Sequence, residues 1–263
     1  MAIFRNYNAG ARAIAAGVAQ TVVWNSSDIP GTGVSAYHID MTGAGNDFAN
    51  VTRVRIKAAG QTIWDVNGPH IQSMIQRLGR SNLAPAAADT NFVLPLYKED
   101  YGDNEGMKFL GGFPRGLAPT LEIDVDAAVA AGNAFCGWSQ SDQPFAFYTK
   151  YIGSQTNIAA GVVNGRVPLT QDGIIRGISI NSVGLLRLKI QMSGVQLMNL
   201  SAAQIQAYQR LENTAVVVDP VFIPIEFPFA AVGGDSYFEL DTQGGVWVGP
   251  TNEITVYSVL ANS

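Results

Sequence analysis

The stretch VTRVRIKAAGQTIWDVNGPHIQSMIQRLGR, residues Val51–Arg80, contains a β-rich run, a glycine turn, a second extended run and a short helical pattern. A second stretch, Gly184–Asn213, has the same features in the same order: GLLRLKIQMSGVQLMNLSAAQIQAYQRLEN. Self-similarity of this kind indicates that one structural unit occurs twice in the chain.

The matching positions keep a nearly constant separation. Arg53–Ile56 matches Arg187–Ile190 at 134 positions, and Gly60 matches Gly194 at the same separation. Further matches follow in order: Ile71 with Ile205, Leu94-Pro95-Leu96 with Ile223-Pro224-Ile225, and PTLEIDV (Pro119–Val125) with PTNEITV (Pro250–Val256). We therefore interpret the chain as a tandem duplication of a unit of about 130 residues, each closing with the pattern P-T-x-E-I-x-V.

Short alternating β-rich runs, separated by glycine and proline turns, fill most of both halves. This pattern is typical of a β-sandwich or barrel. Only two segments have a helical period. Ile71, Met74, Ile75 and Leu78 form one apolar stripe; the second helix is predicted to begin at Ser201, which with Gln204 fits a capping box.

The predicted fold is therefore all-β: two tandem eight-stranded jelly rolls, each with one short flanking α-helix. We expect the first roll in residues 1–140, with an N-terminal arm of about residues 1–17, and the second roll in residues 141–263.

Composition limits the classes of function. The net charge is −5 and there is no basic run, so no specific binding of nucleic acid is expected. Charged residues make up only 14% of the chain, which suits a protein that buries much surface against other subunits. The N-terminus makes a poor signal peptide, no apolar run reaches membrane-spanning length, and the single cysteine excludes an intrachain disulfide framework. We expect synthesis in the cytosol.

The duplicated unit resembles the double jelly-roll major capsid proteins of tailless icosahedral bacteriophages with an internal membrane, the corticovirus and tectivirus type. The resemblance is carried by RVRIKAAGQTIWDVNGPHIQSMIQ (residues 53–76), by LEIDVDAAVAAG (residues 121–132) and by the second copies of both. It implies a structural protein of the virion, made in the host cytoplasm, that forms homotrimers. These would pack as pseudo-hexagonal capsomers against neighbouring capsomers and minor capsid or vertex proteins. Arg5 and Arg12 of the N-terminal arm would face the interior and the membrane.

No residues are predicted to be catalytic, to bind a cofactor or to hold a metal ion. His38 and Asp40 share a strand face but lack further ligands, and His70 is expected to face solvent in the first turn of a helix. Cys136 has no basic neighbour and is interpreted as a buried thiol. Glu122, Asp124 and Asp126 are interpreted as a solvent or subunit-contact face.

Two weaker hypotheses stay open. The acidic segment at residues 97–106, which contains Glu99, Asp100, Asp103 and Glu105, offers oxygen ligands suited to structural calcium, although its spacing differs from an EF-hand loop. The alternative function is a receptor- or carbohydrate-binding β-sandwich, in which Trp24, Trp64, Trp138 and Trp247 are candidates to stack on sugars. Trp64 and Trp247 lie in apolar runs and are better interpreted as core residues.

Overall fold

The computed structural model describes residues 3–29, 34–58, 60–68, 70–72, 85–96, 118–141, 147–155, 164–168, 174–180, 185–192, 194–205, 207, 221–230, 237–242 and 253–261. Within these residues the chain consists of sixteen β-strands, a 3-10 turn η1 (Phe48–Asn50) and helical residues at 68, 70–72, 202–205 and 207. The chain divides into two compact units, Met1–Ile152 with Leu260–Ser263, and Gly153–Val259. The all-β prediction is confirmed.

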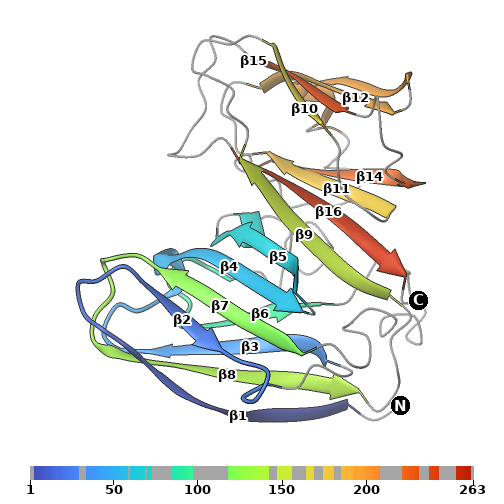
Figure 1. Ribbon diagram of the computed structural model, residues 1–263. Coiled ribbons are helices and arrows are strands. Elements are labelled where there is room, and N and C mark those ends of the chain that lie inside the picture. Colours follow the sequence, from blue (N-terminus) through green and yellow to red (C-terminus); the bar gives the residue numbers. More distant parts are fainter. Residues whose placement is uncertain are drawn as a thin grey trace. The chain divides into compact units, whose positions relative to one another are not determined.

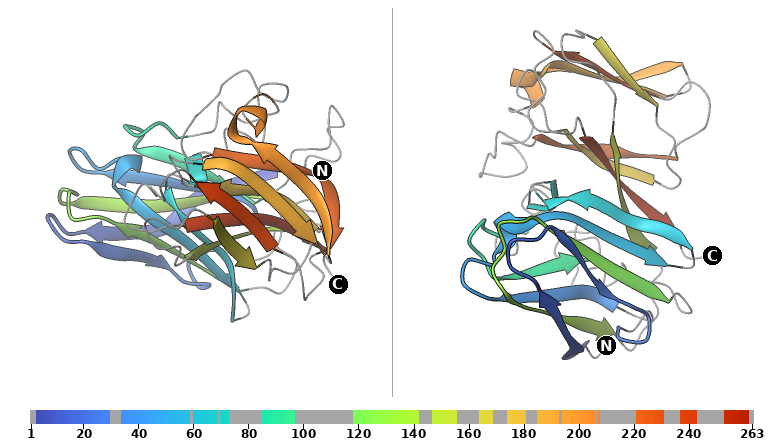
Figure 2. Two further views of the ribbon diagram at one scale, coloured as in Figure 1. Left: turned by 90° about the horizontal axis from the view of Figure 1, so that it is seen from above. Right: turned by 60° about the vertical axis from the view of Figure 1, so that its left-hand side comes forward.

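The first eight strands form two antiparallel layers (Figure 1). One layer has the order β1-β8-β3-β6 and the other the order β5-β4-β7-β2. The strands are β1 (Ile3–Ile14), β2 (Gln20–Trp24), β3 (Val34–Thr42), β4 (Val51–Ala58), β5 (Gln61–Asn67), β6 (Asn91–Pro95), β7 (Pro119–Val125) and β8 (Gly132–Ser141). Figure 2 shows the two layers from further directions.

The last eight strands repeat this arrangement. Their orders are β9-β16-β11-β14 and β13-β12-β15-β10, which are the first two orders with eight added to each strand number. The strands are β9 (Phe147–Gln155), β10 (Asn164–Pro168), β11 (Ile174–Ile180), β12 (Leu185–Met192), β13 (Val195–Ser201), β14 (Val221–Ala230), β15 (Tyr237–Thr242) and β16 (Glu253–Ala261). Eight antiparallel strands in two such layers make a jelly roll, so the prediction of two tandem eight-stranded rolls is confirmed.

The β4–β5 hairpin recurs as the β12–β13 hairpin in fine detail. Ile56 pairs with Trp64, and one residue is then left over in β5 before Lys57 pairs with Thr62. In the second hairpin Ile190 pairs with Met198, and one residue of β13 is likewise left over before Gln191 pairs with Gln196. The turns also agree, because Gly60 and Gly194 have φ values of 75° and 78°, a conformation that glycine adopts at little cost. A shared bulge and turn are strong support for duplication at a separation of 134 positions.

The predicted match between PTLEIDV and PTNEITV is wrong. Strand β7, which contains the first segment, lies between β4 and β2, whereas β16, which contains most of the second, lies between β11 and β9. The strand that pairs with β12 as β7 pairs with β4 is β15. The true repeat is therefore Glu122-Ile123-Asp124 with Glu239-Leu240-Asp241, at a separation of 117 positions.

The Leu94-Pro95-Leu96 match, in contrast, joins equivalent strands. Pro95 pairs with Ala36 in the β3–β6 ladder, and Pro224 pairs with Gly177 in the β11–β14 ladder. Both β6 and β14 lie at the end of a layer. Proline fits there because an edge strand does not need every backbone N–H for pairing.

Strand β1 covers most of the predicted N-terminal arm of about residues 1–17, and it runs antiparallel to β8 from Ile3↔Ser141 to Ile14↔Gly132. Arg12, expected to face a particle interior, donates through Nε to the Val23 carbonyl at 2.8 Å and pairs through Nη2 with Asp28 at 2.6 Å. Residues 3–14 thus pair within the first roll. The N-terminal arm and the division between residues 140 and 141 both stay predictions.

The core of the first roll lies between its two layers. Its largest buried side chains are Trp24, Trp64, Tyr37, Ile29, Ile39, Met41 and Ile56.

The start of the first helix packs closely on β4, since a Cβ atom on Gly68 would lie 2.1 Å from the Val51 carbonyl oxygen. The second helix begins with the predicted capping box. The Ser201 N–H donates to Gln204 Oε1 at 2.9 Å, and the Gln204 N–H donates to Ser201 Oγ at 3.3 Å. No helix in the described part of the chain is long and apolar enough to cross a membrane.

Candidate functional site

The most developed polar surface lies on the outward face of the β5-β4-β7-β2 layer. In β4, Val54, Ile56 and Ala58 are buried, while the alternate residues Arg53, Arg55 and Lys57 point outward. Strand β7 alternates in the same way, with Glu122 and Asp124 on the outward face. Two-residue periodicity thus places three basic side chains beside acidic side chains of the next strand.

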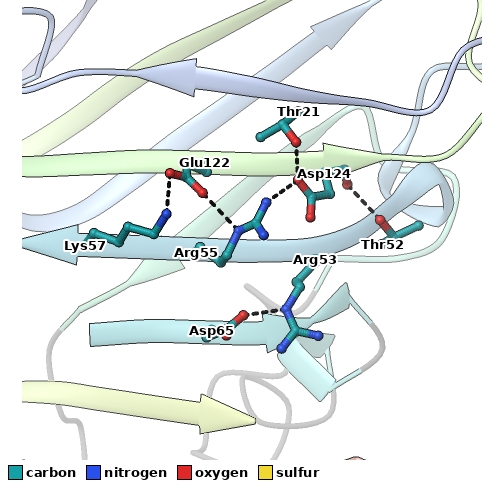
Figure 3. Close-up of polar contacts among 8 residues, drawn as sticks. All are labelled: Thr21, Thr52, Arg53, Arg55, Lys57, Asp65, Glu122 and Asp124. Carbon is teal, nitrogen blue, oxygen red and sulfur yellow. Dashed lines mark hydrogen bonds and ion pairs between the residues drawn. The ribbon is translucent and has the colours of Figure 1, made fainter. Parts of the chain in front are cut away.

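These side chains form two neighbouring groups, which together we call the ion-pair ladder (Figure 3). Arg55, Lys57, Glu122 and Asp124 are linked between β4 and β7, and Arg53 pairs with Asp65 between β4 and β5. Arg55 lies at its centre, with Nε 3.0 Å from Glu122 Oε2 and Nη2 2.5 Å from Asp124 Oδ1. Lys57 Nζ lies 2.7 Å from the other Glu122 oxygen. Arg53 pairs with Asp65 of β5. The ladder therefore joins three neighbouring strands.

The ladder extends to β2, because Thr21 Oγ1 donates to Asp124 Oδ1 at 2.6 Å. Three cations face three carboxylates, so the network is neutral in itself. Glu122 and Asp124 are engaged by cations, which makes them poor candidates for acid–base catalysis or for holding a further metal ion. Asp126 lies beyond the strand end, where its Oδ1 accepts from the Ala128 N–H at 2.8 Å. The outward-facing interpretation of Glu122 and Asp124 agrees with the structure, whereas Asp126 has a local role in a turn.

The second roll has a smaller copy of the ladder. Arg187 Nη1 donates to Asn199 Oδ1 at 3.1 Å, in the position of Arg53 and Asp65. Lys189 Nζ lies 2.5 Å from Glu239 Oε1, in the position of Arg55 and Glu122. The hydrogen bond from Lys189 lowers the pKa of Glu239, and Arg166 of β10 assists at 3.4 Å.

Conservation of the ladder's geometry between the rolls indicates a structural role. Equivalent backbone positions carry ion pairs or hydrogen bonds that tie the same three strands together, although the residue types differ. The sequence signal for it was the alternation R-x-R-x-K in β4 against E-x-D in β7. That signal gives the faces of the strands, and only the strand order shows which charges meet.

His38 lies on the outward face of the β1-β8-β3-β6 layer and is half-buried. Its Nε2 lies 2.7 Å from Ser139 Oγ, a contact across the β3–β8 ladder that sequence reasoning missed. Ser139 is 8% exposed and Asp40 is exposed. The pair is thus a hydrogen bond within the layer, and the buried serine is poorly placed to meet a substrate.

The expectation that His70 faces solvent is wrong. His70 is fully buried, and neither ring nitrogen has a hydrogen-bond partner among the described residues. Burial, with a smaller contribution from the positive charge of Arg53, lowers the pKa of His70 to about 4. Gly68 and Ile71 are buried as well, so the start of this helix packs on the roll and does not face solvent.

The prediction of a buried Cys136 thiol is confirmed: the residue is inaccessible, and burial raises its pKa to about 12. Such a thiol is a poor nucleophile at neutral pH. Burial also raises the pKa of the neighbouring Tyr37 well above its usual value.

The candidate binding residues find no support within the described residues. Trp24, Trp64 and Trp138 are buried at 0%, 1% and 9% exposure, so they offer no stacking surface for sugars. Trp247 and the acidic segment at residues 97–106 lie outside the described residues. Among the residues that the structure describes, no group of His, Cys, Asp or Glu side chains is arranged to hold a metal ion.

Two jelly rolls in tandem, with the same strand order and the same hairpin details, define the double jelly-roll fold. No protein-family model and no curated protein matches the sequence. Solved structures do match over nearly the whole chain.

The major capsid protein P2 of bacteriophage PM2 superposes with a TM-score of 0.77 at 14% sequence identity, covering 100% of this chain and 98% of that one. A chain of the atomic structure of Sulfolobus turreted icosahedral virus has a TM-score of 0.65 at 13% identity, with 98% and 90% covered. A chain of the PBCV-1 virus capsid has a TM-score of 0.58 at 11% identity, with 98% and 92% covered. At these identities the likeness establishes the shared double jelly-roll fold.

Proposed function

We propose that the chain is the major structural protein of an icosahedral virion, and that it assembles into a shell. The observation that carries this proposal is the match of both rolls, over the full length of each chain, to a bacteriophage major capsid protein. A likeness of one roll alone would be weaker support, because single jelly rolls also occur in lectin domains and cupins.

The described residues support a structural role in a second way. Their polar side chains interact with one another: the charges of the ion-pair ladder balance, and His38 forms a hydrogen bond with Ser139. The Cys136 thiol is buried. The carbohydrate-binding alternative loses its main basis, since the three described tryptophans lie in the core.

The assembly that we propose is a homotrimer whose six rolls make a pseudo-hexagonal capsomer, which then packs against other capsomers and minor capsid or vertex proteins over an internal membrane. Duplication supports this arrangement, because two similar rolls per chain let a threefold assembly approximate sixfold packing. A lipid contact through the N-terminal stretch has less support than the trimer, since strand pairing engages Ile3–Ile14. The virion is the proposed location, after synthesis in the host cytoplasm.

Light scattering on the purified chain tests the proposal. We expect a particle of 3 × 28.0 kDa, or 84.0 kDa, under conditions that favour assembly. A stable 28.0 kDa monomer across a wide range of protein concentration, salt and pH would contradict it.

A further inference from the structure

Strands β5 and β13 are equivalent in backbone but differ in what lies along the edge that faces away from the preceding strand. On one side each pairs with the strand before it, with the same bulge. On its other side β5 pairs in parallel with β9, through Trp64↔Tyr151 and Asp65↔Ile152, all four residues belonging to the first compact unit. Strand β13 is the last strand of its layer among the described strands.

The burial of the two strands differs accordingly. Ile63, Trp64 and Val66 of β5 are 3%, 1% and 0% exposed. Their equivalents in β13, Leu197, Met198 and Leu200, are only half-buried, and Val195 is 60% exposed. An apolar strand with an open edge is a site where another strand readily adds.

Most other strands at the ends of layers carry protection that β13 lacks. Strands β6, β10 and β14 contain prolines, at Pro95, Pro168 and Pro224 among others. The Val23 carbonyl of β2 accepts a hydrogen bond from Arg12. Strand β13, with the sequence VQLMNLS, contains neither proline nor a charged residue. Natural edge strands usually carry prolines or charged residues because these features prevent unwanted pairing with other strands. Strand β13 has neither, as expected for an edge that another strand covers in the assembled protein.

The structure also indicates which strand fits this edge. The strand added to β5 is β9, the first strand of its roll, which neighbours the eighth strand β16. Its equivalent is β1, the first strand of the other roll, which neighbours β8 and lies at the end of its layer. The sequences agree, since Phe4 and Tyr7 stand where β9 has Tyr148 and Tyr151.

We propose that the edge of β13 that no described strand covers pairs in parallel with β1 of a second copy of the chain, as β5 pairs with β9. The register of β5 on β9 is transferred with a separation of 134 positions for β13 and of 144 positions for β1, the latter aligning Phe4 and Tyr7 with Tyr148 and Tyr151. It places Met198 opposite Tyr7 and Asn199 opposite Asn8 of the second copy. The contact is head-to-tail, with one β13 edge and one β1 edge used per chain, so three copies close into a ring if each is rotated by a third of a turn. The proposal rests on the proposed shell function and specifies the contact that builds it.

Engineered disulfide formation tests this register. Directly opposed residues on paired strands lie about 5 Å apart, within the roughly 4.4–6.8 Å between Cα atoms that a disulfide requires. The background is low because the single native cysteine is buried. We expect the double variant N8C/N199C to form, under mild oxidation, a covalent trimer that migrates near 84.0 kDa, 3 × 28.0 kDa, on non-reducing gels.

The matched control is V18C/N199C, which places a cysteine at a position that is 52% exposed and outside the proposed contact. It should remain monomeric on the same gels. If N8C/N199C does not fold, the single variants N8C and N199C, co-expressed, should give one mixed disulfide dimer, whereas each expressed alone should give none.

The outcomes separate this proposal from the proposed function. Trimers seen by light scattering without cross-linking in N8C/N199C and in the co-expressed pair would overturn the β13–β1 contact and leave the shell function standing. Absence of any trimer in the unmodified protein would contradict the shell function itself.

Discussion

The β4–β5 and β12–β13 hairpins share a backbone but differ in environment. Both have the same register, bulge and positive-φ glycine, yet the core residue Trp64 is 1% exposed while its counterpart Met198 is half-buried. The comparison shows that alternation and turn chemistry set the local structure, whereas burial depends on what packs against it. Substitutions at equivalent positions of the two rolls, and at the cap that begins the second helix, can break or refine this comparison.

The largest difference is expected from truncating the paired core residues. Trp64→Ala should lower the free energy of unfolding of its roll by about 3–5 kcal/mol, because it leaves a large cavity in a closed core. Met198→Ala should cost less than about 2 kcal/mol, since part of the side chain already contacts water. Urea unfolding of each variant measures both values, and equal losses would contradict the difference in burial.

A pH dependence should distinguish His70 from its counterpart Gln204. The pKa of His70 is lowered from 6.5 to about 4 in the folded chain, so the unfolded state binds the proton first as the pH falls. The contribution of His70 is therefore complete above pH 6.5 and is lost towards pH 4, by a total of about 3 kcal/mol.

The variant His70→Leu removes this titration, and its unfolding free energy should fall less between pH 6.5 and 4 than that of the unmodified chain. Gln204→His is the matched control, because an exposed imidazole titrates alike in both states and adds no slope. Parallel pH profiles for His70→Leu and the unmodified protein would show that His70 is not buried in neutral form.

The two ion-pair networks should differ by a smaller amount. Arg55→Ala leaves Glu122 and Asp124 without their shared partner and should cost about 1–2 kcal/mol, reduced by partial solvent exposure. Lys189→Ala removes one contact to Glu239 and should cost less than about 1 kcal/mol. Denaturant midpoints at low and high salt measure both, and a loss for Arg55→Ala that is no greater than that for Lys189→Ala would contradict the central role of Arg55.

The smallest change concerns the cap of the second helix. Ser201→Ala removes the oxygen that accepts from the Gln204 N–H and should cost about 1 kcal/mol. Ser201→Thr keeps a hydroxyl and should cost much less. Thermal unfolding of the two variants gives the comparison, and identical losses would indicate that the hydroxyl contributes nothing.

Much of the fold could be predicted from the sequence because the repeat lies in strands with strong alternation. The β4–β5 and β12–β13 hairpins, the edge prolines and the Ser201 cap all follow from local patterns. The equivalence of β7 and β15 was missed because the connections before them differ in length, residues 96–118 against residues 231–236. This changes the repeat separation from 134 to 117 positions, and a chance likeness to β16 took its place.

The polar residues were predicted less well, because their roles depend on contacts between distant strands. The two-residue alternation predicts that Glu122 and Asp124 face outward, but it cannot show that Arg55 forms ion pairs with both carboxylates. His70 lies off the predicted apolar stripe of its helix, so the helical pattern gives no signal that this side chain is buried.

Negative-stain electron microscopy of the purified chain shows directly whether it assembles into capsomers. We expect threefold particles with six roll-sized lobes arranged as a pseudo-hexagon, and extended arrays of them under assembly conditions. A field of separate single chains under every condition tried would rule out a capsid shell built from this chain.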